Sequence, residues 1–582
     1  MLSQQIEIIK AIEEEIHSSS KPRHFKVFSA SRQTNTIRIR ISSQASDGPF
    51  DNTLEGGAAS WKQWASTVVS VSTEESSIYI HLINCLLPEP GTEITINPPK
   101  FLESLLQCWK NEDIATKCFS WATHALVERD RRPIDVSPSF SDLRQRQREA
   151  YSLLSYSAGF LWGPPGTGKT TTAAAIVADL LCSDANARIL LIAPTNIAVD
   201  QLLTNVDDRL SSSPKGQLLR RYCARVGSNF AARLYEGRRH LLPEATDEVV
   251  IRKAQLEVFQ PDPDKPEARA QWEKEMSGIL AALRSQVQLV LKERRVVAMT
   301  ATLATMHFGL LREESKFDLA VFDEASQLGR VVSLMLAPLA HRVLIAGDPR
   351  QLSPIFKSNH ASVKRWFGQT LFDNFMHESH ASTCFLNEQS RMSEEICTLV
   401  SKVFYSGQLE VSKGSLTDGK WRDARQPMPL FASSPHNLHL VEVNTESERY
   451  VSSHRRIESA QMAVSIAQKL GIHVDHSKIM ILTPFIAQRK LIRKELDARG
   501  IRRIRVSTVH AAQGAEFHTI IFDPVKGMSP FLLDFGKGSR LLNVAISRAQ
   551  ACFVLLASKG DLNNSLLAAI AAHIRNASNL FV

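Results

Sequence analysis

Paired cysteines and long apolar runs are both missing from this 582-residue chain. Its eight cysteines are scattered with no Cys-x-x-Cys pair, which argues against a zinc module, an iron–sulfur cluster or a disulfide framework. No apolar run reaches about 18 residues, and the first segment, MLSQQIEIIKAIEEEIHSSS, has no apolar signal core. We therefore expect an intracellular protein, cytoplasmic or nuclear, with reduced thiols and no membrane segment.

The composition is that of an ordinary globular protein, with 43% hydrophobic and 22% charged residues. A chain of this length is too long for one hydrophobic core and indicates roughly three or four domains. The formal charge of +9 is compatible with a polyanionic partner such as nucleic acid. Charge alone does not establish such a partner, because many basic proteins bind none.

Three regions of the chain differ in pattern. Residues 1–135 open with a helical segment and continue with short β-rich runs between Gly, Pro and Ser turns, which indicates a small barrel or sandwich with flanking helices. Residues 136–361 and then 362–582 alternate apolar strands with helical segments, as in RILLIA, DLAVFD, KIMILT and TIIFD. This alternation is typical of parallel sheets, so the predicted fold class is α/β with two tandem domains. A charged helical insertion interrupts the first of them at about 236–292.

The strongest local motif is GPPGTGKT, which lies between the apolar run FLW and the helical TTAAAIVADLL. A strand, a glycine-rich loop and a helix in this order form a P-loop, whose backbone amides and helix N-terminus bind phosphate. In a chain of this length the motif arises by chance on the order of once in fifty. We expect Lys169 to contact the terminal phosphates and Thr170 to bind Mg2+. The predicted nucleotide-binding residues of the loop are Gly163, Pro164, Pro165, Gly166, Thr167, Gly168, Lys169, Thr170 and Thr171.

Two later strands end in polar residues. DLAVFDEASQ carries Asp323 to the carboxyl end of an apolar strand, which is where ligands bind in open α/β sheets. We expect Asp323 to hold Mg2+ and Glu324 to polarise an attacking water. GDPRQLSP follows the next strand, so Asp348 and Gln351 lie at the same edge of the sheet. Gln351 is thereby placed to sense the terminal phosphate.

Together these motifs resemble those of superfamily 1 helicases, on the Upf-like branch that includes the nonsense-mediated-decay helicase. LRQRQREA (143–150) is similar to the glutamine motif of that family. APTNIAVDQL (193–202), VSTVHAAQGAEF (506–517) and RLLNVAISRAQ (540–550) match further family segments, in the family's order. The resemblance covers about residues 140–557 and implies two RecA-like P-loop domains that hold ATP between them.

The resemblance also implies roles for individual residues of the ATP site. It makes Gln147 the candidate adenine-reading residue. It implies that Arg391 and Arg548 reach from the second domain to the terminal phosphate, where a guanidinium group spreads charge over the phosphate oxygens. The implied nucleotide site is completed by Gln513, Gly514 and Glu516, with Glu516 toward the ribose.

Ser390 departs from the family, which has an aromatic residue here in a pattern resembling QYRM. In superfamily 1 that ring is a stacking platform for the base, and serine cannot stack. The departure predicts relaxed discrimination among bases, or a substitute ring such as Phe385 or Tyr405.

Hydrolysis in a cleft between two domains alternately closes and opens them, which moves a strand that both domains grip. Contacts to phosphate and sugar carry little sequence information, so we expect binding that tolerates any sequence and weakens with salt. Outside the family context each threonine below is more often a helix cap or a strand residue. The implied nucleic-acid-binding residues are Thr195, Asn196, Thr300, Thr302, Thr483, Pro484 and Thr508.

The predicted function is that of an ATP-dependent helicase or translocase, moving 5′ to 3′ on single-stranded DNA or RNA, with ATP and Mg2+ as cofactors and a monomeric state. The alternative is a nucleic-acid-stimulated ATPase switch that remodels or recruits partners without unwinding. A small-molecule kinase or GTPase does not account for the second α/β domain and its two arginines. The cysteine spacing lacks the zinc-rich module of the decay helicase, so a role in that pathway is not implied.

Overall fold

The computed structural model describes residues 2–19, 23–32, 36–42, 58–62, 64–74, 77–83, 87–97, 101–124, 142–227, 230–242, 287–314, 317–376, 380–427, 436–450, 453–512 and 514–579. Most of the helical insertion expected at about 236–292 lies outside these residues, and so does Gln513. Within the described segments, none of the helices combines the length and the apolar character needed to cross a bilayer.

The amino-terminal region contains a closed antiparallel barrel. Its strand order is β1-β2-β5-β4-β3-β6. Alternate side chains such as Ile37, Ile39 and Ile41 are buried inside it, because successive residues of a strand point to opposite faces. Of the two folds that the β-rich pattern left open, the structure is therefore the barrel. The strands are β1 (Arg23–Arg32), β2 (Thr36–Ser42), β3 (Ala58–Trp61), β4 (Trp64–Glu74), β5 (Ser77–Ile83) and β6 (Glu93–Asn97).

The first α/β domain is built on a parallel 7-stranded sheet in the order β13-β7-β12-β11-β8-β10-β9. Strands such as β8 are buried along their whole length because helices cover both faces of the sheet. Ile189 and Leu191 pack in one core cluster with α5 (Lys169–Ser183) and α6 (Asn196–Ser211). The strands are β7 (Ala158–Trp162), β8 (Ile189–Ala193), β9 (Cys223–Arg225), β10 (Val296–Thr300), β11 (Phe317–Phe322), β12 (Ala340–Gly347) and β13 (Thr383–Phe385).

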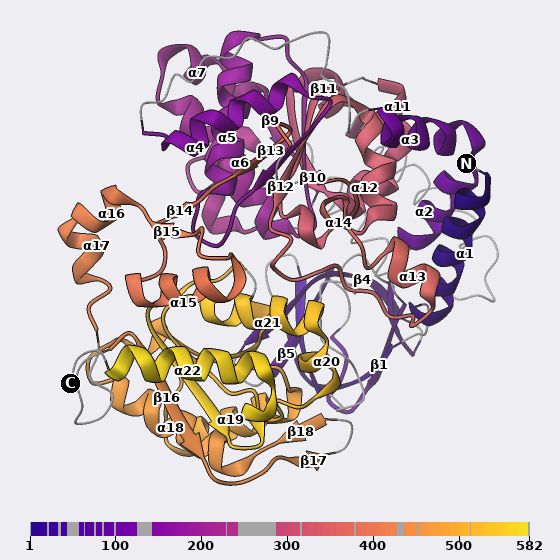
Figure 1. Ribbon diagram of the computed structural model, residues 1–582. Helices are drawn as coiled ribbons and strands as arrows, with labels where there is room; N and C mark the ends of the chain where they lie inside the picture. The colour runs from indigo at the N-terminus through magenta and orange to yellow at the C-terminus, as the bar shows by residue number, and fades with distance from the viewer. Residues whose placement is uncertain are drawn as a thin grey trace.

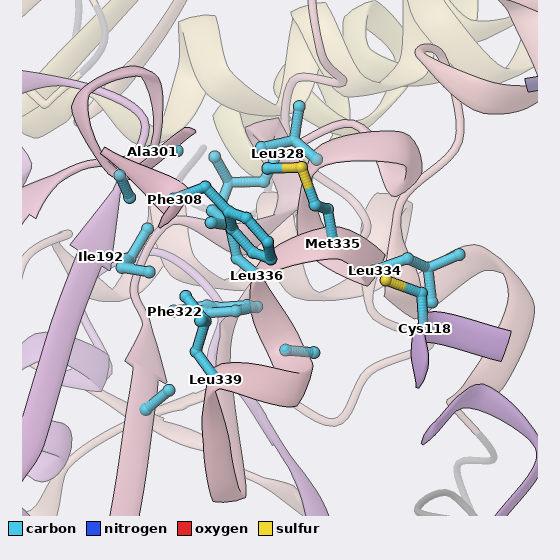
Figure 2. Packing of buried hydrophobic residues seen from close by; sticks show 14 of the residues in the cluster. Cys118, Ile192, Ala301, Phe308, Phe322, Leu328, Leu334, Met335, Leu336 and Leu339 are labelled. Carbon is cyan, nitrogen blue, oxygen red and sulfur yellow. The ribbon is translucent and has the colours of Figure 1, made fainter. Parts of the chain in front are cut away.

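The opposite face of this sheet receives the helices that flank the barrel in sequence. Ile192 and Phe322 pack there with α12 (Arg330–Leu336), and Cys118 of α3 (Glu112–His124) lies beside Leu334, as Figure 2 shows. Figure 1 shows the first domain at the top, the second at the lower left, and the barrel at the lower right below α1 (Leu2–Ser19), α2 (Phe101–Lys110) and α3. The helices of the amino-terminal region and the first domain thus share one hydrophobic core.

Hydrogen bonds also join α1 and α2 to the first domain. Trp109 of α2 donates its indole N–H to the carbonyl of Val331 at 3.1 Å. The buried Glu15 of α1 accepts hydrogen bonds from the backbone N–H groups of Lys357 at 2.8 Å and Ser358 at 2.9 Å. Buried carboxylates need such donors, since an unpaired charge in the interior is costly.

Strand β13 lies beyond residue 361, where the sequence pattern placed the change of domain. Its residues Thr383–Phe385 pair with Phe160–Trp162 of β7, so the first sheet takes its edge strand from the segment assigned to the second domain. Trp366 and Phe372, also after residue 361, belong to the core of the first domain. A three-residue edge strand is too short to carry a periodic signal, which is why the pattern missed it.

The second α/β domain has a parallel 5-stranded sheet in the order β16-β22-β21-β19-β20. Together the two sheets confirm the predicted α/β class with tandem domains and a β-rich accessory domain. The strands are β16 (Leu438–Val443), β19 (Ile479–Thr483), β20 (Arg505–Thr508), β21 (Phe517–Phe522) and β22 (Ala549–Ser558), and the main helices are α15 (Glu394–Phe404), α18 (Ile457–Leu470), α19 (Ile486–Ala498), α21 (Phe535–Ser547) and α22 (Ser565–Asn579).

Candidate functional site

The loop between β7 and α5 has the conformation that only its glycines allow. Gly166 and Gly168 have φ angles of 75° and 82°, in the left-handed region that side chains disfavour. A Cβ atom on Gly163 would lie 2.2 Å from Cγ of Lys169, and one on Gly168 would lie 2.7 Å from Nε2 of Gln147. The loop therefore turns tightly around the start of α5, with its backbone amides available at the helix N-terminus.

Lys169 and Thr170 begin α5 at the carboxyl edge of the sheet. Lys169 donates from Nζ to the carbonyl of Gly163 at 2.7 Å and is almost buried. Thr170 donates from Oγ1 to Oδ2 of Asp323 at 2.9 Å, although the two residues are far apart in sequence. Hydroxyl and carboxylate oxygens are the ligands that Mg2+ prefers, with the remainder taken from water and phosphate. The donor set of Thr170 and Asp323 therefore fits a magnesium ion.

The acidic pair Asp323 and Glu324 follows β11, and Glu324 has an uncommon backbone conformation. Burial raises the pKa of Asp323 to about 6, the charge of Glu324 adds to the rise, and Thr170 and Lys169 oppose it. Glu324 has a φ angle of 50°, which is uncommon for a residue with a side chain and recurs at functional sites. Its carboxylate accepts a hydrogen bond from the side-chain amide of Gln327 at 3.2 Å. The turn thus fixes Glu324 next to Asp323, whose carboxylate contacts Thr170 of the P-loop.

Gln351 is buried in a hydrogen-bond network centred on Asp348. The carboxylate of Asp348 accepts from Nε2 of Gln351 at 2.8 Å, from the indole of Trp162 at 3.0 Å and from the hydroxyl of Tyr405 at 2.6 Å. Asn543 of the second domain donates to the Tyr405 hydroxyl at 2.7 Å. The network therefore runs from the first sheet to α21 of the second domain.

Arg391 and Arg548 lie near enough for their charges to interact, and Arg391 bonds to the carbonyl of Ser547, the residue before Arg548. Arg548 is 3% exposed, and burial lowers its pKa to about 10, with the charge of Arg391 adding to the fall. The charges of Glu324, from the first domain, and Glu516 oppose that fall, which means that Arg548 lies within electrostatic reach of the P-loop side. Among the residues that the structure describes, neither arginine has an acceptor for its Nε–H group.

Arg391 is also pressed against the P-loop. A Cβ atom on Gly166 would lie 2.6 Å from Cβ of Arg391. Its Nη2 atom lies 2.5 Å from Oε1 of Glu516, and Nη1 donates to the carbonyl of Ser547 at 3.3 Å. Gly514, with a φ angle of 77°, forms the turn before Glu516. Arg391 thus links the P-loop of the first domain to Glu516 of the second.

Comparison with known proteins identifies the family to which the chain belongs. Two family models, each described as an AAA domain, match the chain over residues 142–257 and 255–359 and over residues 367–560. The chain is 26% identical over 462 residues to the ATP-dependent helicase NAM7 of Saccharomyces cerevisiae, covering 75% of this chain and 44% of NAM7. The chain belongs to the Upf-like branch of the superfamily 1 helicases.

Two further relatives carry the same core. The helicase-family chain is 25% identical over 455 residues to the DNA-binding protein SMUBP-2 of Mesocricetus auratus, covering 73% of this chain and 43% of that protein. It is 27% identical over 456 residues to the DNA polymerase alpha-associated DNA helicase A of Saccharomyces cerevisiae, covering 71% of this chain and 65% of that protein. The matched region spans less than half of NAM7 and of SMUBP-2.

The substitute rings considered for Ser390 are both engaged elsewhere in this superfamily 1 chain. Tyr405 is 3% exposed and its hydroxyl is bonded to Asp348. Phe385 packs edge-on against Trp162 at a centroid separation of 4.8 Å. Tyr405 could stack on a base only by leaving the Asp348 network, whereas Phe385 is half-buried, so the expectation of a substitute ring stays a prediction for Phe385.

Gln147 lies next to the P-loop. It is buried, its Nε2 donates to the carbonyl of Thr167 at 3.2 Å, and its Oε1 accepts from the backbone N–H of Arg144 at 2.9 Å.

The sequence did not single out Arg144 or Asn543. Both lie inside segments that matched the family, so a residue-by-residue reading of those segments was the signal that could have found them.

The proposed strand-gripping residues fall into two groups at the carboxyl edges of the sheets. In the first domain, Thr195 follows β8 and Thr300 ends the neighbouring strand β10. They cap α6 and α10 (Ala301–Met306), accepting from Ala198 N and Leu303 N at 3.3 Å. Thr302 is half-buried in α10. The side chain of Asn196 accepts from Nη2 of Arg225 at 2.7 Å.

In the second domain, Thr483 and Thr508 are paired across β19 and β20. Thr483 is fully buried and its hydroxyl accepts from Phe485 N at 3.4 Å, so its side chain is not available to a nucleic acid in this conformation. Thr508 is also buried, whereas Pro484 is only half-buried. The predicted contact from the Thr483 side chain is therefore not supported by its burial.

Proposed function

We propose that this protein is an ATP-dependent helicase or translocase that moves 5′ to 3′ on single-stranded DNA or RNA. The observation that carries the proposal is the convergence of two sets of residues. Lys169, Asp323 and Glu324 come from the first domain, while Arg391 and Arg548 come from the chain beyond its last strand. One chain supplies both sets, which favours a monomer.

Hydrolysis follows from these positions. Glu324 orients and polarises a water for attack on the terminal phosphate, and Lys169 balances the charge of the phosphate oxygens. Mg2+, held by Thr170 and through water by Asp323, would neutralise charge on the β- and γ-phosphates. Arg391 and Arg548 stabilise charge that develops on the transferred group. Gln147, Gly514 and Glu516 line the remainder of the proposed nucleotide site.

The coupling to movement is proposed to pass through contacts that join the two domains. The hydrogen bonds from Gln351 and Tyr405 to Asp348, and from Asn543 to Tyr405, link the phosphate side of the first domain to α21. Loss of the terminal phosphate removes a charge that Arg391 and Arg548 contact. The domains then separate, and a strand gripped alternately at the two sheet edges advances.

The nucleic-acid partner is proposed to lie across those two edges, near Thr195 and Thr300 in the first domain and Pro484 and Thr508 in the second. The name of helicase A describes that relative as a DNA helicase, and SMUBP-2 is described as DNA-binding. These names make DNA the first substrate to test, and RNA of the same sequence is the comparison.

The deciding experiment measures ATP hydrolysis at fixed salt while matched DNA and RNA oligonucleotides are titrated, and strand displacement on duplexes with a 5′ or a 3′ overhang. We expect nucleic acid to stimulate hydrolysis and the 5′-overhang duplex to be unwound. Stimulated hydrolysis without displacement or movement would favour the alternative, a nucleic-acid-stimulated switch. Absence of hydrolysis with every oligonucleotide would refute both.

A further inference from the structure

Both backbone polar groups of Ser390 are hydrogen-bonded, the N–H to the P-loop and the carbonyl to Trp421 and Arg425. Its N–H donates to the carbonyl of Gly166 at 3.1 Å. Its carbonyl accepts from the indole of Trp421 at 2.5 Å and from Nη2 of Arg425 at 3.1 Å. These three bonds leave the position of the serine little freedom, so its hydroxyl is a fixed acceptor at the side of the loop.

The Arg144 guanidinium group uses that acceptor. Its Nη2 donates to the hydroxyl of Ser390, and its Nη1 donates to the carbonyl of Glu388 at 2.5 Å. The backbone N–H of Arg144 donates to Oε1 of Gln147. Arg144 therefore lies between Gln147 and Ser390. Hydrogen bonds from Nη1 and Nη2 fix the orientation of its guanidinium plane.

This place is at the nucleoside end of the proposed phosphate site. The terminal-phosphate end is marked by Lys169, Asp323 and the two cleft arginines. Gln147 and Ser390 flank the loop. The side chain of Gln147 lies against Gly168, and the backbone N–H of Ser390 donates to the carbonyl of Gly166. A nucleotide whose phosphates follow the loop thus directs its base past these two residues.

We propose that the planar guanidinium group of Arg144 is the platform on which the base of the nucleotide stacks, and that Ser390 is the residue that positions it. The inference rests on the proposed function, because it requires a nucleoside triphosphate in the P-loop site. Guanidinium planes stack on bases and rings through their faces, and Nη1 and Nη2 of Arg144 each already donate one hydrogen bond to the Glu388–Ser390 segment, which fixes the plane. Every base has such a face, so this platform accepts all four bases with small differences.

The test measures the dissociation constants of ATP, GTP and inorganic tripolyphosphate, the last of which has no base, by calorimetry in the presence of Mg2+. We expect Arg144→Ala to weaken ATP and GTP about tenfold, within the range of single-base stacking contributions, and to leave tripolyphosphate within about twofold. Arg146→Ala is the matched control, because Arg146 is an exposed neighbour paired with Glu149 at 2.7 Å. It should change none of the three constants.

Arg144→Lys separates stacking from charge, since lysine keeps the charge without the plane. It should bind ATP as weakly as Arg144→Ala does, and it serves as the informative variant if the alanine variant does not fold. Full ATP affinity in Arg144→Lys, or an equal loss for ATP and tripolyphosphate in Arg144→Ala, would overturn the stacking assignment. A wild-type protein that binds neither ATP nor tripolyphosphate would instead refute the proposed function.

Discussion

The guanidinium group of Arg391 is paired with the carboxylate of Glu516, with 2.5 Å between Nη2 and Oε1. The two residues lie far apart in sequence, beside the P-loop and before β21, respectively. The pair holds the positive charge of Arg391 at the cleft, while its Nε–H has no acceptor among the described residues. A phosphate group entering the cleft therefore meets an arginine that is already oriented and only partly satisfied.

Removing either cleft arginine should slow hydrolysis without preventing binding. We expect Arg391→Ala and Arg548→Ala to lower kcat by about three to five orders of magnitude, because such residues act mainly on the transition state. The dissociation constant for ATP should change little. Steady-state hydrolysis and nucleotide titration give the two values, and Arg575→Ala, on the surface beside Glu442, is the control. Full activity in either arginine variant would contradict the assignment.

Lys169→Ala should abolish hydrolysis and also weaken nucleotide binding. The amine lies next to Gly163 at the base of the loop, where it is available to both bound phosphates and developing charge. The matched control is Lys215→Ala in α7 (Pro214–Leu219), an exposed lysine. Hydrolysis rates and binding of ATP measured for both proteins check the prediction, and normal turnover by Lys169→Ala would rule out the P-loop as the active phosphate site.

Glu324→Gln should bind ATP but turn over slowly. Glutamine keeps the size and the contact with Gln327 but cannot polarise a water as a carboxylate does, so we expect kcat to fall by about 10²–10⁴. The variant should accumulate with ATP bound and the domains closed. Filter retention of labelled ATP together with hydrolysis kinetics measures both properties. A variant that neither retains ATP nor hydrolyses it would show that Glu324 is needed for binding rather than for the chemical step.

The ion pair between Arg225 and Asp200 should contribute strongly to the stability of the first domain. Both side chains are fully buried, with 2.8 Å between Nε and Oδ1. Arg225→Met leaves a buried carboxylate without its partner, which costs about 3–5 kcal/mol in the free energy of unfolding. The urea midpoint of the first unfolding transition checks the prediction.

The control for this prediction is Arg575→Met, whose partner Glu442 is 58% exposed. Loss of an exposed pair should change the free energy of unfolding by less than about 1 kcal/mol. Equal midpoints for the two variants would show that burial adds nothing to the Arg225 pair. Because Arg225 also holds Asn196, Arg225→Met should in addition weaken binding of single strands.

Several parts of the site were predictable because their signal is local. The P-loop is one short segment whose glycines and lysine are read directly from GPPGTGKT, and Asp323 follows an apolar strand by one residue. The alternation of strands and helices predicted the α/β class in the same way. The three-residue strand β13 gave no such signal, because its place in the sheet depends on pairing with β7.

The sequence by itself predicted the phosphate loop and the acidic pair from neighbours within a few residues, and the two arginines through the family resemblance. Only the tertiary structure decided which of them meet: Thr170 with Asp323, Arg391 with Glu516, and Arg144 with Ser390. It also decided that Tyr405 belongs to the Asp348 network and Thr483 to the interior. The physical reason is that contacts between distant segments depend on how the two sheets and their helices pack, and no local pattern records that packing.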